Sequence, residues 1–113
     1  MRRVRYRYVA VKIDDGELDQ RDAVMAVSRN LIRLFGEYGA SVAELTYIGS
    51  ELNNRILIFR CTHVALEMVR ASIASLKEIN RRRCSTRIVY VSGTLKALRR
   101  RISQSRDELA VQR

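Results

Sequence analysis

The chain has 113 residues, of which 47% are hydrophobic, and its 22 Lys and Arg against 12 Asp and Glu give a net charge of +10. This length predicts one domain, residues 1–113, with a core that needs no disulfide or metal ion to stabilise it. No run of about 18 apolar residues occurs, which argues against a transmembrane helix. Residues 1–15 have no apolar stretch of signal-peptide length. We therefore expect an intracellular, cytoplasmic protein.

The positive charge is unevenly distributed. From residue 81 onward there are ten Lys and Arg against two acids, whereas the first eighty residues have twelve against ten. Lysine occurs only at Lys12, Lys77 and Lys96, and the planar guanidinium of arginine suits phosphate binding and stacking better than an ammonium group. A pI near 10.6 with clustered arginines indicates nucleic-acid binding. On charge alone, an anionic membrane or protein surface is the alternative.

The first half of the chain reads as strand, helix, strand, strand. Residues 4–13 alternate with period two, with Val9 and Val11 on one face and Tyr6 and Tyr8 on the other. Apolar residues then recur at helical spacing through Tyr38, which predicts a helix capped by Asp19 or Asp22 and ended near Gly36–Gly39. The next strands are expected at residues 41–48 and 55–61. The second of these is apolar on both faces, as in a central strand.

The second half predicts a helix, a strand and a final helix. Thr62 is placed to cap a helix whose buried stripe continues to Ile79, and residues 86–92 read as the fourth strand. Thr94 is placed to cap a basic C-terminal helix over about 94–110. The acids at 107–108 fall near the end of that helix, where the helix dipole disfavours them, so we expect the last turn to fray.

This order, βαββαβ plus a C-terminal helix, predicts an α+β sandwich of the ferredoxin-like or RNA-recognition-like kind. Right-handed crossovers give a four-stranded antiparallel sheet with the two long helices on one face and the first and third strands central. On the other face, Tyr6, Tyr8, Phe59 or Tyr90 are candidates for stacking on bases. Residues 55–61 lack the glycine-containing signature of RNA-recognition domains. Because both faces of the sheet are apolar, we favour packing roles for these aromatics and expect the terminal helix or a partner to cover the second face.

Residues for self-sufficient catalysis are absent from the pattern. Cys61 and Cys84 form no CxxC pair, and His63 is the single histidine, so the ligands of a zinc site are not available and we expect none. The acids between Asp14 and Asp19 resemble a calcium loop only weakly, without its downstream bidentate glutamate. A solvated turn is the favoured interpretation. We expect neither a catalytic residue nor a metal site in the chain itself.

Four stretches together resemble one known family, the archaeal ribonuclease P protein component 2. They are Arg5-Tyr-Arg-Tyr-Val-Ala-Val in the first strand, Leu34-Phe-Gly-Glu-Tyr-Gly-Ala at the end of the first helix, Ile58-Phe-Arg-Cys before the second helix, and Val91-Ser-Gly-Thr before the basic helix. They occur in the family's order and cover nearly the whole chain.

The resemblance implies a subunit of the ribonucleoprotein endoribonuclease that removes 5′ leaders from precursor tRNA. In that family the RNA subunit carries catalysis with Mg²⁺, so we expect no cofactor on the protein. The implied partners are ribonuclease P RNA, precursor tRNA indirectly, and ribonuclease P protein component 3 in a heterodimer, commonly a dimer of heterodimers. No membrane partner is expected.

The residues expected to contact RNA form three clusters around the fourth strand. Because that strand and the first are antiparallel neighbours, the N-terminal arginines should meet the end of the fourth strand. Two alternatives remain: a general RNA- or ribosome-associated protein outside ribonuclease P, and a small-molecule regulatory domain using Gly36, Gly39 or Gly49. The expected RNA-binding residues are Arg2, Arg3, Arg5, Arg7, Arg81, Arg82, Arg83, Lys96, Arg99, Arg100 and Arg101.

Overall fold

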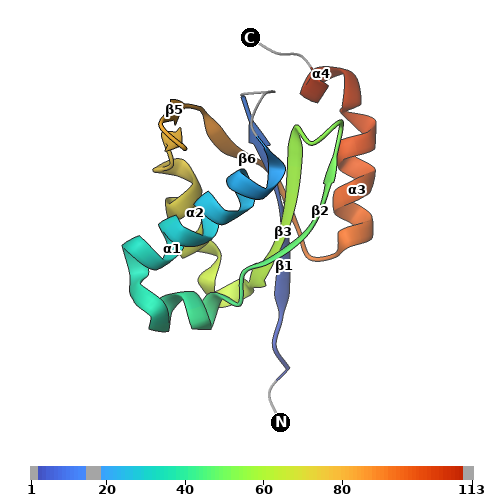
Figure 1. Cartoon of the computed structure of the whole chain (residues 1–113). Coiled ribbons are helices and arrows are strands. Elements are labelled where there is room, and N and C mark those ends of the chain that lie inside the picture. The colour runs from blue at the N-terminus through green and yellow to red at the C-terminus, as the bar shows by residue number, and fades with distance from the viewer. Residues whose placement is uncertain (1–2, 15–18, 111–113) are drawn as a thin grey trace.

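The computed structural model describes residues 3–14 and 19–110, the side chain of residue 110 excepted. Its main sheet has four antiparallel strands in the order β2–β3–β1–β6 (Figure 1). The strands are β1 (Tyr6–Ile13), β2 (Thr46–Glu51), β3 (Ile56–Thr62) and β6 (Thr86–Ser92). The predicted ferredoxin-like order, with the first and third strands central, is confirmed.

Helices cover both faces of this sheet (Figure 1). Helices α1 (Gln20–Ala43) and α2 (Leu66–Ala74) pack on one face. Helix α3 (Leu95–Gln104) and the short α4 (Arg106–Ala110) lie on the other. The C-terminal helices therefore cover the second apolar face, as expected.

Each face of the sheet has its own hydrophobic core. Val9, Leu57 and Phe59 belong to the core under α1 and α2. Ile58 and Leu98 belong to the core under α3. The period-two alternation predicted for β1 and β3 therefore assigns their side chains to the correct faces.

Helix α1 is longer than predicted. Asp19 caps it by accepting a hydrogen bond from the backbone N–H of Arg21 at 3.4 Å. The predicted end near Gly36–Gly39 is wrong, because Gly36 (φ 75°) only kinks the helix, which continues to Ala43. The second strand accordingly begins at Thr46 instead of residue 41.

The kinked end of α1 also changes which residues are buried. Leu34, Phe35 and Tyr38, expected in the core stripe, are 39%, 37% and 83% exposed. Gly36 interrupts the helical geometry (φ 75°, ψ 175°), so the residues after it do not continue the stripe of the first half. Among residues 37–43 only Ala43 is buried, and it belongs to the core under α1 and α2.

The segment between β3 and β6 departs furthest from the prediction. Thr62 does not cap the following helix with its side chain; its hydroxyl donates to the carbonyl of Val42 at 2.9 Å. A 3₁₀ turn, η1 (His63–Ala65), precedes α2, and α2 ends at residue 74, before the predicted Ile79. A small hairpin of β4 (Glu78–Ile79) and β5 (Arg82–Arg83) follows.

The C-terminal helix is interrupted at Ser105. Thr94 caps α3 as predicted, accepting a hydrogen bond from the N–H of Ala97 at 3.2 Å. Asp107 and Glu108 lie in the first turn of the separate helix α4, where the positive end of the helix dipole favours them. The prediction of one continuous helix over about 94–110, with these acids near its end, is therefore wrong. None of the helices in the described part of the chain is long and apolar enough to span a membrane.

Candidate nucleic-acid interface

The start of β1 and the end of β6 form one basic region. Tyr8 pairs with Ser92 in the register of these antiparallel strands. Arg7 donates from Nη1 to the carbonyl of Tyr6 at 2.9 Å, and the same atom lies 3.9 Å from the position of a Cβ on Gly93. The start of the first strand therefore meets the end of the fourth, as predicted, and Arg7 is the arginine placed there. We call this set the strand-end cluster, and its described members are Arg3, Arg5, Arg7 and Lys96; Arg2 lies outside the described residues.

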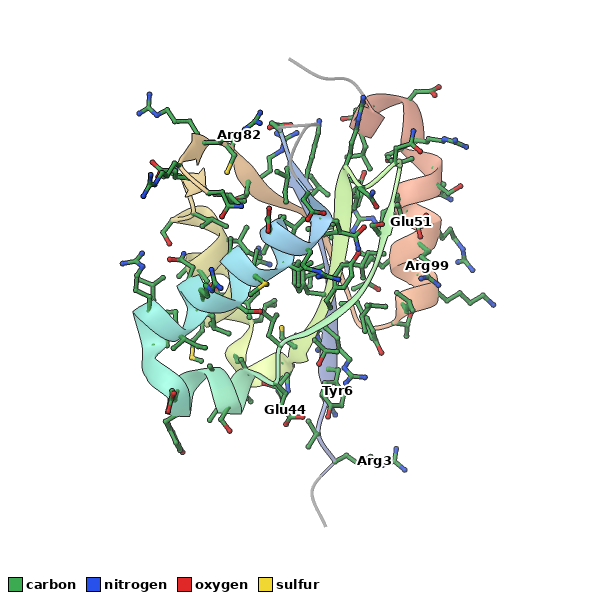
Figure 2. The ribbon with its side chains drawn as sticks, in the orientation of Figure 1. Arg3, Tyr6, Glu44, Glu51, Arg82 and Arg99 are labelled. Carbon is green, nitrogen blue, oxygen red and sulfur yellow. The ribbon has the colours of Figure 1, made fainter. Side chains whose placement is uncertain are left out.

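The β4–β5 hairpin carries a second basic region. Arg81, Arg82 and Arg83 are all exposed, and we call them the hairpin cluster. Asn80 and Arg81 form the turn, and both have positive φ, 52° and 67°. Arg82 lies at the opposite end of the molecule from Arg3 (Figure 2). These two basic regions therefore face different directions.

The third expected cluster lies along α3, and two of its arginines make contacts within the chain. Arg99 pairs with Glu51, Nε to Oε2, at 3.4 Å (Figure 2). The guanidinium carbon of Arg101 lies 4.2 Å from the ring centroid of Tyr90. Arg100 is exposed. Arg99 and Arg101 thus also help to hold α3 on the sheet.

Helix α3 runs back along the sheet instead of extending away from it. Glu51 pairs with Ile56, which pairs with Lys12, which pairs in turn with Arg87 at the start of β6. Through its contact with Glu51, Arg99 therefore reaches toward the end of the sheet where β6 begins. The hairpin cluster therefore lies near the start of β6 and Arg7 at its end, whereas Arg99 on α3 reaches back toward the start.

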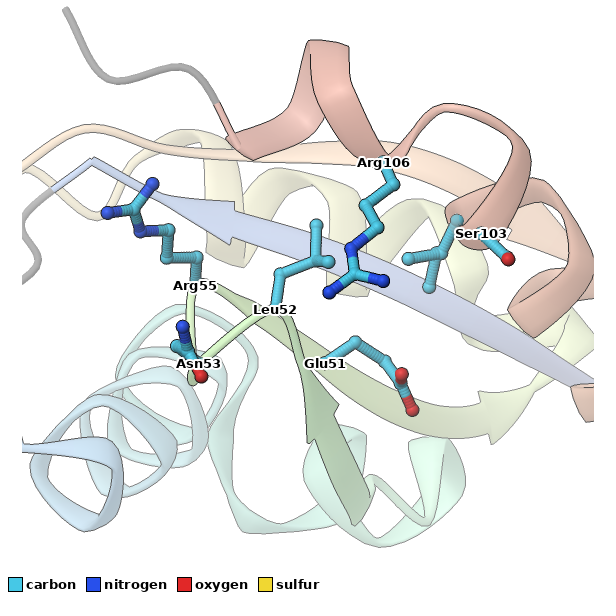
Figure 3. A pocket seen from close by; sticks show the side chains of 7 residues that line it. Glu51, Leu52, Asn53, Arg55, Ser103 and Arg106 are labelled. Carbon is cyan, nitrogen blue, oxygen red and sulfur yellow. The ribbon is translucent and has the colours of Figure 1, made fainter.

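Two arginines that the sequence analysis did not single out line a cleft of about 370 Å³ between the β2–β3 turn and the α3–α4 junction (Figure 3). They are Arg55 and Arg106, and Glu51 lies on the wall with them. The turn has positive φ at Leu52, Asn53 and Asn54. These arginines were missed because they are isolated in the sequence and meet only through the fold. The cleft is lined by Glu51, Leu52, Asn53, Arg55, Ile102, Ser103 and Arg106.

The sheet aromatics are largely unavailable for stacking on bases. Phe59 is fully buried under α1 and α2, with its ring centroid 5.7 Å from that of Tyr47 in an edge-on arrangement. It is therefore not available to stack on a base. Tyr8 and Tyr90 pack against the core under α3. Tyr6 lies at the margin of that face, with the guanidinium carbon of Arg60 4.6 Å from its ring centroid.

Cys61 and His63, the groups that could act as a nucleophile or a metal ligand, occupy structural positions. Burial raises the pKa of the Cys61 thiol from 9.0 to about 11, although the nearby positive charge of Arg7 acts in the opposite direction. The backbone N–H of His63 donates to the carbonyl of Arg5 at 2.8 Å. Within residues 3–14 and 19–110, no three His, Cys, Asp or Glu side chains gather as a metal site would require. Part of the acidic turn, residues 15–18, lies outside the described residues.

An exposed apolar surface occupies the second half of α1 and the adjoining η1 turn. Tyr38 and Val64 are 83% and 69% exposed, and Phe35 and Val42 are each 37% exposed. The hydrogen bond between Thr62 and the carbonyl of Val42 joins the two segments. We call Phe35, Tyr38, Val42 and Val64 the helix-end patch. Glu37 and Glu44 are exposed on the same stretch of chain, so this region is both apolar and acidic.

Comparisons with known proteins agree with this architecture. Residues 5–103 match the model of the Rpp14/Pop5 family. Proteins named Ribonuclease P protein component 2 are 32% identical in Methanosarcina mazei, over 83% of this chain and 80% of that protein, and 31% identical in Methanobrevibacter smithii, over 87% and 88%.

The fold also recurs in a larger assembly. A chain in the cryo-EM structure of yeast ribonuclease MRP superposes with a TM-score of 0.66 at 14% identity, covering 96% of each chain. At that identity the likeness concerns the fold alone. With a family model that spans nearly the whole described fold, and relatives above 30% identity over most of their length, the chain belongs to the Rpp14/Pop5 family.

Proposed function

We propose that this chain is an RNA-binding protein subunit of ribonuclease P, which supports removal of 5′ leaders from precursor tRNA by a catalytic RNA. The observation that carries the proposal is the match of residues 5–103 to the Rpp14/Pop5 family. Relatives of similar length named as components of that enzyme support it. The chain itself would supply binding and positioning, and Mg²⁺ would reside on the RNA.

The strand-end and hairpin clusters would bind separate segments of this RNA. They lie at opposite ends of the sheet (Figure 2), and the eight residues of β1 alone span about 26 Å. That length exceeds the Debye length of about 8 Å at physiological salt, so each cluster acts on its own phosphates. Neutralising two RNA segments from one rigid sheet lowers the repulsion between them and favours the folded RNA.

Salt dependence of binding tests this arrangement. If about six phosphates are neutralised, log K for transcribed ribonuclease P RNA should fall with log salt at a slope of roughly −4 to −5. Replacing the three arginines of either cluster with alanine should make the slope shallower by about 2 to 3 units. The matched control replaces Arg29, Arg33 and Arg70, on the outer surface of α1 and α2, and should change it little. A nearly flat slope for the unaltered chain would contradict the proposal.

For the protein partner, we propose ribonuclease P protein component 3, docked on the helix-end patch. Tyr38 is 83% exposed, and a large exposed aromatic among other apolar groups is characteristic of a protein interface. Glu37 is exposed and adjoins Tyr38 in the chain, so its negative charge favours a protein over RNA at this surface. Assembly as a dimer of heterodimers would follow from a second contact between copies.

Charge substitutions in the patch test the docking site. Tyr38→Glu and Val64→Asp should each abolish co-purification with component 3 and leave RNA affinity unchanged. Met25→Glu is the control, because Met25 is 42% exposed in the first half of the same helix. Light scattering of the purified complex then gives its stoichiometry. Retained co-purification in both patch variants would place the partner elsewhere.

A further inference from the structure

Arg60 is an anomaly in an otherwise apolar strand. The β3 residues on both sides of it, Phe59 and Cys61, are fully buried. By alternation, Arg60 shares the α3 face with Ile56 and Ile58. It is half-buried, and its Nε is buried without a hydrogen-bond partner among the described residues. A buried donor left unsatisfied is unfavourable and calls for an explanation.

The guanidinium of Arg60 lies over an aromatic ring. Its central carbon lies 4.6 Å from the ring centroid of Tyr6, a favourable cation–π separation. The hydroxyl of Tyr6 donates to Oε1 of Glu44 at 3.2 Å, which fixes the far end of the ring, and Tyr6 and Glu44 lie side by side in Figure 2. Across the sheet, Arg60 pairs with Tyr8 on β1 and Thr46 on β2.

Helix α3 begins beside this end of the face and runs toward the opposite end. The helix starts at Leu95, just after the end of β6, and further along it Arg99 contacts Glu51, at the other end of β2. Alternation assigns Arg7 to the other face, opposite Cys61, but its guanidinium lies at the strand end, where Nη1 donates to the carbonyl of Tyr6 and lies 3.9 Å from the position of a Cβ on Gly93. A cation over a ring on one face therefore lies one strand away from a phosphate-binding group at the edge of the sheet.

We propose that the Tyr6–Arg60 pair is a binding site for one unpaired RNA nucleotide, whose base stacks on the guanidinium of Arg60. The phosphate of that nucleotide would extend around the strand end toward Arg7, beside Gly93. The proposal rests on the chain being an RNA-binding subunit, as argued above. Stacking on an arginine plane is sequence-tolerant because every base has a π face, and it requires a base that is free of a duplex.

The test uses the whole chain and a single-stranded RNA of about ten nucleotides that carries 2-aminopurine, a base whose fluorescence falls on stacking. The unaltered chain should quench it on binding. Arg60→Met, which keeps side-chain length, should abolish the quenching and weaken binding about 5- to 100-fold, as expected for one stacked base. A duplex of the same sequence should be bound equally by both proteins.

Further variants separate stacking from charge and from folding. Arg60→Lys keeps the charge, and should bind the single strand like Arg60→Met while the salt dependence stays as in the unaltered chain. Tyr6→Phe keeps the ring and should retain the quenching. Tyr6→Leu removes the ring and should lose it. Circular dichroism and the thermal midpoint report whether each variant is folded.

Distinct results would overturn the proposal. If Arg60→Lys binds and quenches like the unaltered chain, charge alone explains Arg60. If single-strand and duplex affinities fall together, the contact is to the RNA backbone only. Failure of the unaltered chain to bind ribonuclease P RNA would instead overturn the proposed function, whereas binding of that RNA with equal affinity by the folded Arg60→Met variant would overturn the nucleotide site alone.

Discussion

The turn of the β4–β5 hairpin places an arginine where glycine is ordinarily preferred. Asn80 and Arg81 both have positive φ, 52° and 67°, and link the paired residues Ile79 and Arg82. Two-residue turns of this kind favour Asn-Gly. A left-handed conformation at a non-glycine residue costs about 1–2 kcal/mol. Retention of such a residue at a basic tip is a reason to suspect a function for its side chain.

Arg81→Gly should therefore separate stability from binding. Glycine removes the local cost but adds about 0.4–1 kcal/mol of unfolded-state entropy, so the free energy of unfolding should stay constant or rise by up to about 1.5 kcal/mol. Urea denaturation measures this change. Binding to ribonuclease P RNA should weaken, with a salt slope shallower by about one unit for the lost phosphate contact.

Asn80→Gly is the matched control, because it alters the same turn without removing a charge. Asparagine tolerates the left-handed region, so stability should change by only a few tenths of a kcal/mol, and the salt slope should not change. A loss of more than about 1 kcal/mol in Arg81→Gly would refute the strain argument. An unchanged salt slope in a stable Arg81→Gly variant would remove the hairpin tip from the RNA interface.

Three further results are expected. Leu98→Ala, between α3 and the sheet, should lower the free energy of unfolding by about 2–5 kcal/mol in urea titrations. Arg100→Ala, at an exposed position of the same helix, should change it by under about 0.5 kcal/mol. Equally small effects of both substitutions would mean that α3 is not packed on the sheet. Asn30→Ala removes an amide that donates to the carbonyl of Ser72 at 2.6 Å and should lower the free energy of unfolding by about 1–3 kcal/mol. A loss below about 0.5 kcal/mol would mean that this buried hydrogen bond contributes little. Because the folded-state pKa of Cys61 is about 11 against an ordinary 9.0, the stability from its neutral thiol is complete below about pH 9 and lost as pH rises toward 11. A Cys61→Ala variant should lack this component of the alkaline loss, and identical pH profiles would contradict the assignment.

Strand order and strand faces could be predicted because both follow from local patterns. Period-two alternation in residues 6–13 and 56–62 assigns each side chain to one face. The placement of β6 beside β1 follows from connecting the elements with right-handed crossovers. These features rely on chemistry that repeats along the chain, so a single sequence is enough to detect them.

The boundaries of the helices could not be predicted, because they depend on tertiary context. Glycine at 36 signals a helix end locally, but the chain resumes a helix after one left-handed residue. The apolar spacing that includes Tyr38 looks like a core stripe, yet Tyr38 follows the kink at Gly36 and is 83% exposed. Periodicity reports that a helix has an apolar side, not whether that side is covered.

Parts of the candidate interface were hidden for a different reason. The hairpin was missed because its turn lacks glycine, and Arg60 was missed because it is one arginine within an apolar strand. Its relation to Tyr6 depends on strand register, which places residues more than fifty positions apart side by side. Clustered arginines are visible in a sequence, whereas a site assembled from single residues on different strands is not.

The most direct test of the central claim is recovery of the tagged chain from native extract of its own organism, with the bound RNA sequenced. The eluate would also be assayed for removal of 5′ leaders from precursor tRNA. We predict enrichment of ribonuclease P RNA together with this cleavage activity, and loss of both when the strand-end and hairpin arginines are replaced together. Recovery of ribosomal or mixed RNA without the activity would contradict a role in ribonuclease P while leaving the basic surfaces as a general RNA-binding feature.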